Sequence, residues 1–141
     1  MKAFAFLLIC LAALGCSEKS PTLVNLPDAA GKSLRLEIYP SPDGKRPAAS
    51  FNVTEPKSVN AILGILWQGV EQTDHKCADI GTATITFADE QTVTIEILPG
   101  HETEYYEFRY QRKNHRVPRN AFLAALEKAG IDLSAIPKEC H

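Results

Sequence analysis

Two short segments of the chain pair a histidine with a cysteine. His75 and Cys77 lie near the middle, and Cys140 and His141 are the last two residues. Thiolate and imidazole are common ligands of zinc and copper, so convergence of all four side chains would make a metal site. The spacing matches no zinc-finger pattern, and in an oxidising compartment two cysteines more simply form a disulfide. We therefore predict a disulfide between Cys77 and Cys140. A metal-binding protein or enzyme that uses all four residues is the alternative.

A run of basic and aromatic residues is the second candidate. The residues that we expect to form a binding surface are Tyr105, Arg109, Arg112, Lys113 and Arg116, and the same run includes His115 and Arg119. Such a surface would suit anionic groups on a protein, a glycan or a lipid headgroup. The alternative is a solvated strand whose arginines pair with the acidic residues of the same region, which are Glu102, Glu104 and Glu107.

The sequence carries none of the common catalytic signatures. It has no nucleophile elbow, P-loop, dinucleotide-binding glycine motif or zinc-protease motif, since His101-Glu102 lacks the second histidine. The chain has 141 residues, and its formal net charge of -2 argues against a nucleic-acid-binding protein. We predict one domain, no cofactor and a binding rather than an enzymatic role.

The elements that must position these residues are indicated by hydrophobic periodicity. Apolar and polar residues alternate in three successive segments between Thr82 and Gln111, as a strand with one buried face requires. Residues 34–39 and 49–53 alternate in the same way and flank a proline- and glycine-rich turn. Residues 115–117 are expected to form a short further strand.

Two helices are expected to cover the apolar face of this sheet. The first begins at Thr54 or Glu55 with Pro56 in its first turn, and its apolar stripe is Val59, Ile62, Leu63, Leu66 and Val70. The second starts near Pro118, carries Phe122, Leu123 and Leu126, and ends near Gly130. The predicted fold is α+β: an antiparallel sheet made of a β-hairpin, a helix, a three- to four-stranded meander and a second helix, with both helices on one face.

The N-terminus has the features of an export signal. Lys2 precedes an unbroken apolar run from Ala3 to Leu14, which is shorter than the roughly 20 residues that span a membrane. The ending Leu11-Ala12-Ala13-Leu14-Gly15-Cys16 resembles the lipobox of bacterial lipoproteins, with Ala13 and Leu14 in reversed order. That resemblance implies lipidation of Cys16 and a membrane anchor. Cleavage after Gly15 by an ordinary signal peptidase, giving a secreted or periplasmic protein, is the alternative.

The number of cysteines favours the lipoprotein interpretation. Cys10 leaves with the signal, so a lipid on Cys16 would leave Cys77 and Cys140 as an even pair. We expect a signal peptide at residues 1–15, a lipidated tether at 16–32 and one domain at 33–141. The expected function is a non-enzymatic binding module of the cell envelope, with an envelope protein or an anionic glycan or headgroup as partner. An inhibitor or envelope-assembly accessory lipoprotein is the alternative.

Overall fold

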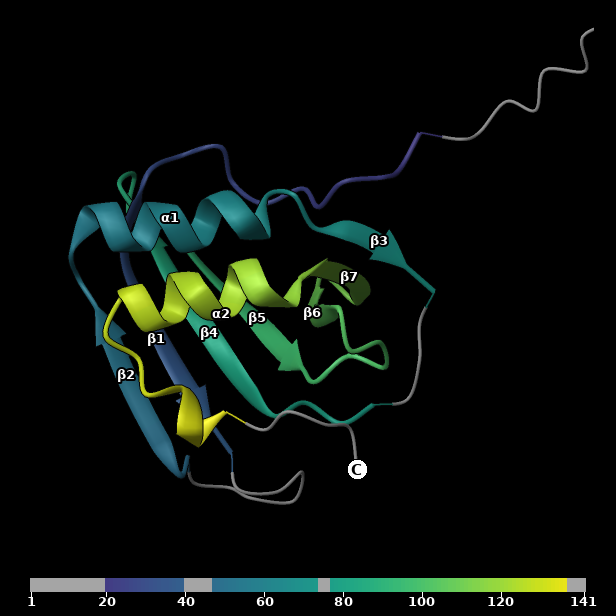
Figure 1. Cartoon of the computed structure of the whole chain (residues 1–141). Coiled ribbons are helices and arrows are strands. Elements are labelled where there is room, and N and C mark those ends of the chain that lie inside the picture. The colour runs from purple at the N-terminus through teal and green to yellow at the C-terminus, as the bar shows by residue number, and fades with distance from the viewer. Residues whose placement is uncertain (1–19, 40–46, 74–76, 137–141) are drawn as a thin grey trace, which may run out of the picture.

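The computed structural model describes residues 20–39, 47–73 and 77–136. It is a two-layer α+β fold in which a seven-stranded antiparallel sheet packs against two helices (Figure 1), which confirms the predicted class. The elements in chain order are β1 (Gly31–Ile38), β2 (Ala49–Val53), α1 (Pro56–Leu66), β3 (Val70–Gln72), β4 (Gly81–Phe87), β5 (Thr92–Leu98), β6 (Tyr105–Tyr110), β7 (Lys113–Pro118), α2 (Arg119–Lys128) and the short 3-10 helix η1 (Leu133–Ala135).

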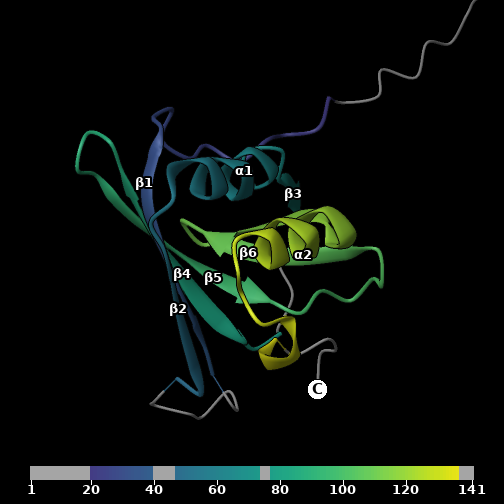
Figure 2. The same cartoon turned by 60° about the vertical axis from the view of Figure 1, so that its left-hand side comes forward.

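The strand order in the sheet is β2-β1-β4-β5-β6-β7-β3. Strands that follow one another in sequence pair directly from β4 to β7, and β1 pairs with both β2 and β4. Between β2 and β3 the chain crosses the whole sheet as α1. Both helices lie on the same face of the sheet, and Figures 1 and 2 show this arrangement from two directions.

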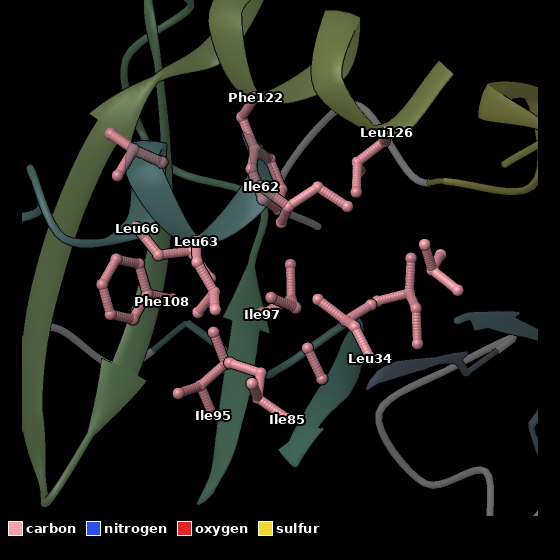
Figure 3. Close-up of a cluster of buried hydrophobic side chains, with 14 of the residues drawn as sticks. Leu34, Ile62, Leu63, Leu66, Ile85, Ile95, Ile97, Phe108, Phe122 and Leu126 are labelled. Carbon is pink, nitrogen blue, oxygen red and sulfur yellow. The ribbon is translucent and has the colours of Figure 1, made fainter. Parts of the chain in front are cut away.

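The core lies between that face and the helices. Figure 3 shows side chains of α1 and α2 pointing toward the apolar residues of the central strands. The buried side chains at this contact include Leu34, Ile62, Leu63, Leu66, Ile85, Ile95, Ile97, Phe108, Phe122 and Leu126. Each of these side chains gains roughly 1.5–3 kcal/mol on leaving water, so this contact is the main source of cohesion in the fold.

Helix α1 starts where the sequence predicts. The Glu55 carboxylate accepts hydrogen bonds from the backbone nitrogens of Lys57 at 3.0 Å and Ser58 at 2.6 Å, and Pro56 is the first helical residue. Hydrogen bonds from the side chain of Ser58 and from the backbones of Ser58 and Lys57 lower the pKa of Glu55, because they stabilise its charged form.

Helix α1 ends earlier than the sequence predicts. It stops at Leu66, and Val70, expected as the last residue of its apolar stripe, begins β3 instead. Gly69 separates the two elements and lies against the Phe108 ring so closely that a Cβ there would be 2.8 Å from the ring. The helical spacing of Val70 is therefore a coincidence, since the chain turns back into the sheet at Gly69.

The segment that we predicted as the end of a tether is part of the domain. Val24 and Leu26 are buried in the main core, and the Trp67 indole donates a hydrogen bond to the Pro27 carbonyl at 3.3 Å. Strand β1 itself begins at Gly31. Residues 22–32 thus belong to the domain rather than to the predicted tether at 16–32. The predicted signal peptide, residues 1–15, and Cys16 lie outside the described residues.

Candidate functional site

The face of the sheet opposite the helices, here called the open face, carries mostly polar side chains that pair across the strands, although Leu98, Glu107 and Asn114 on it are buried. The alternation in each strand places on it a row that runs across the sheet: Glu37, Thr82, Glu96, Arg109, Asn114 and Gln72. Arg109 holds the row together, because its Nη1 lies 2.7 Å from Glu96 Oε2 and its Nε donates to Asn114 Oδ1 at 3.0 Å. Asn114 is 1% exposed, and its Nδ2 has no hydrogen-bond partner among the described residues.

Arg116 organises the neighbouring part of the open face. Its guanidinium lies over the Tyr105 ring, 4.4 Å from the centroid, and its Nη1 is 3.2 Å from Glu102 Oε1. Such a cation–π contact is worth roughly 0.5–1 kcal/mol at an exposed site. Arg116 therefore joins β6, β7 and the loop before β6 into one rigid unit.

The turn between β6 and β7 consists of two residues, Gln111 and Arg112. Both have positive φ, 50° and 66°, a conformation that glycine and asparagine adopt more easily than glutamine and arginine. The following residue, Lys113, has its Nζ 2.9 Å from Glu71 Oε2 on β3. Arg112 is exposed and has no ion pair within the described part of the chain.

The five residues of the predicted binding surface are thus not all on one face. Tyr105, Arg109 and Arg116 share the open face, whereas Lys113 points to the helix-covered side and Arg112 occupies the turn. Three of the four cations pair with carboxylates. Glu102 is one of the partners expected from the sequence, while Glu96 and Glu71 are partners that sequence proximity could not indicate.

Arg119 and His115, two further residues of the same basic run, make contacts within the domain. Arg119 donates from Nη2 to the carbonyls of Pro99, Glu102 and Tyr105 at 2.9–3.1 Å, which ties the loop before β6 to the start of α2. Its guanidinium also lies 4.3 Å from the centroid of the Tyr106 ring. Burial raises the pKa of the Tyr106 phenol, and the charge of Arg119 opposes that effect.

His115 faces the core rather than a ligand. It is 3% exposed, and its ring stacks on Phe108 with the centroids 5.2 Å apart. Burial lowers the pKa of His115 because a charged imidazolium would lose its hydration, while the nearby carboxylate of Glu71 opposes the shift. The neutral ring therefore belongs to the hydrophobic core.

Cys77 is buried and disulfide-bonded, and it lies next to His101, which is not among the candidate residues found in the sequence. The Cys77 Sγ lies 3.4 Å from His101 Nε2. Cys140, its predicted partner, lies outside the described residues, as do His75 and His141 of the alternative metal site. The described residues contain no group of three or more side chains suited to hold a metal ion. The closeness of Cys77 and His101 has no signal in the sequence, because 24 residues separate them.

A shallow hollow of about 290 Å³ lies on the open face at its other end, over β1, β2 and β4. Its rim is made of hydroxyl and amide side chains and one arginine: Ser33, Arg35, Asn52, Thr54, Thr84 and Thr86. Arg35 Nη2 pairs with Glu37 Oε1 at 2.6 Å. Leu34 and Val53 also line the hollow, so its wall is largely apolar beneath the polar rim and close to neutral in charge.

Comparison with known protein families, curated protein sequences and solved structures finds no match to this chain. Within the described residues, no helix has the length and apolar character needed to cross a membrane.

Proposed function

We propose that this protein is an exported lipoprotein, anchored in a bacterial envelope through Cys16, that acts by binding an acidic partner rather than by catalysis. Two observations support export. Cys77 is disulfide-bonded, and structural disulfides are typical of oxidising compartments outside the cytosol. The packed domain begins near Thr22, so the export signal and Cys16 precede it in the sequence and leave a short tether between them.

The contact site in this proposal is the turn between β6 and β7. The observation that carries it is Arg112, an exposed arginine with φ of 66° at the tip of the hairpin. A left-handed conformation costs a residue other than glycine roughly 1–2 kcal/mol, and such strain collects at functional sites. Arg109, Lys113 and Arg116 flank the turn, and their ion pairs fix the strands that present it.

The partner class follows from charge and geometry. The Arg112 guanidinium, which has no ion pair among the described residues, offers a planar, bidentate donor to a carboxylate or phosphate group. The nearby cations are each neutralised by a carboxylate, so the site would select an acidic group at one position rather than a broad polyanion. An acidic loop of an envelope protein fits this description best.

Photocrosslinking in the native cell envelope tests the proposal. A photoreactive residue at Gln111 of the full-length chain should give one discrete adduct, while the same residue at exposed Glu127 on α2 should give none. Arg112→Lys should weaken the adduct, because lysine keeps the charge but not the bidentate geometry, and Arg112→Glu should lose it.

Arg112→Gly separates a binding role from a structural one. It should abolish the Gln111 adduct while leaving the free energy of unfolding unchanged or raising it by up to about 1 kcal/mol, because glycine relieves the positive φ. An adduct that survives both Arg112→Glu and Arg112→Gly, or that forms equally from Glu127, would contradict this contact site.

A further inference from the structure

The two edge strands of the sheet, β3 and β2, differ in whether their outer sides are paired. The outer edge of β3 is covered by the N-terminal segment, because Val24 N donates to Gly69 O at 2.9 Å and Glu71 N donates to Thr22 O at 2.8 Å. The opposite edge is β2, and within the described residues no strand or bridge pairs with its outer side. Figure 1 shows β2 on the left of the molecule and β3, beside which residues 22–24 lie, on the right.

Strand β2 carries none of the features that usually block an exposed edge. Its five residues, Ala49–Val53, include no charged side chain and no proline, and its register with β1 is unbroken. An unprotected edge presents unpaired backbone donors and acceptors that can extend the sheet with another strand. The edge is therefore open to strand addition.

The sequence of β2 is nearly symmetric about its centre. Ala49-Ser50-Phe51-Asn52-Val53 reads apolar, polar, aromatic, polar, apolar in both directions. We propose that β2 pairs antiparallel with β2 of a second copy of this chain, with a two-fold axis at Phe51. The two sheets then form one continuous sheet of fourteen strands, since each copy contributes seven.

In this pairing, the side chains that lie opposite one another are compatible on both faces of the sheet. On the open face Ser50 of each copy lies opposite Asn52 of the other, so hydroxyl and amide groups can hydrogen-bond. On the helix-covered face the half-buried Phe51 rings meet at the axis, and Ala49 lies opposite Val53. Because β2 is uncharged, no like charges meet in the new ladder.

The pairing also fits the position of the N-terminus. In each copy, residues 22–24 lie beside β3 and would therefore be at an outer edge of the joined sheet, away from the new contact (Figure 1). A ladder of five residues buries a small area, so we expect weak association in solution. The dimer site uses none of the residues around Arg112, so the dimer and the proposed partner site can be tested independently.

Sedimentation of the mature protein, produced from the full-length chain and held in density-matched detergent, tests the dimer. The wild-type protein should pass from monomer to dimer between about 1 µM and about 1 mM. Ser50→Lys combined with Asn52→Lys places lysine opposite lysine twice and should abolish the dimer. Ser50→Glu combined with Asn52→Lys places glutamate opposite lysine and should restore it. Thr92→Lys, a matched change at an exposed position of the central strand β5, should leave the dimer intact.

Ser50 and Asn52 are exposed, so the folded monomer should tolerate these substitutions, and far-ultraviolet circular dichroism checks this. A wild type that stays monomeric throughout, even if it binds an extended peptide, would overturn the proposal. So would a lysine double variant that dimerises as well as the wild type, or a charge-swapped variant that stays monomeric. The Gln111 adduct should survive in the lysine double variant, which separates failure of this proposal from failure of the partner site.

Discussion

His115 illustrates how a residue that suggests chemistry in the sequence has a different role in the fold. It stands among five basic residues of one run, yet its ring stacks on Phe108 and is almost fully buried. Its partner in the sheet, Glu71, and its neighbour, Lys113, are the charged groups that act on it. Protonation of this ring would place a charge in the core.

The burial of His115 predicts a dependence of stability on pH. Its pKa is lowered from 6.5 in the folded protein, so the unfolded chain binds more protons in that range and stability rises with pH. The contribution should be fully present above about pH 6.5 and should disappear as pH falls through the folded pKa, with a slope of up to about 1.4 kcal/mol per pH unit.

Urea unfolding between about pH 5.5 and about pH 8 measures this slope. His115→Phe keeps an aromatic ring against Phe108 but cannot titrate, so its stability should be nearly constant over the same range. An unchanged slope in His115→Phe would show that another group is responsible.

The charged residues show what the sequence could and could not predict at this scale. Their types and approximate positions in strands are evident from alternation, and the pairing of Arg116 with Glu102 was foreseen as the alternative. The sequence predicts neither the two-residue turn at Gln111 and Arg112 nor, as its consequence, that Lys113 and Arg109 point to opposite sides of the sheet. The partners Glu96 and Glu71 depend on the strand register, which non-local pairing sets.

At the scale of elements, the packing of α1 on β1 depends on one glycine. A Cβ at Gly31 would clash with Val59 Cγ1 and would lie 2.5 Å from Leu63 Cδ1, so the helix packs directly on the strand backbone. Gly31 N also donates to the Asn60 side chain at 2.9 Å. The start of β1 is therefore fixed against α1 by both contact and hydrogen bonding.

Gly31→Ala should destabilise the protein by about 1–3 kcal/mol, the usual cost of overpacking a core. Val59→Ala in the same chain should recover part of this loss, because it removes the nearest methyl group. Gly64→Ala is the matched control: nothing lies within 4 Å of its Cβ, and it should stabilise α1 by about 0.5–1 kcal/mol. Equal effects of the two glycine substitutions in urea unfolding would contradict this packing.

The elements that the sequence predicts well are those with a strong period. Strands β4, β5 and β6 alternate over six or seven residues, and the stripe of α1 is correct up to Leu66. Strand β3 has only three half-buried residues, too few for a period to be visible. The buried segment around Val24 and Leu26 lacks regular structure, and only its contacts with distant residues place it in the core.

At the scale of the whole molecule, a two-layer domain is closed at one sheet edge by its own N-terminal segment. The disulfide at Cys77 lies near the loop that Arg119 fastens to α2, through the contact of Cys77 with His101. The exposed part of the open face, the turn at Arg112 and the β2 edge are among the described surfaces available for contact. Each of them would be useful to a protein held at a membrane surface by a short tether.

The intact mass of the mature protein, measured from its native envelope before and after reduction, tests the central proposal most directly. We predict a chain that begins at a lipid-modified Cys16 and gains the mass of two hydrogens on reduction, as one disulfide between Cys77 and Cys140 requires. A chain that keeps residues 1–15, or one with an unmodified Cys16 and no mass change on reduction, would contradict it.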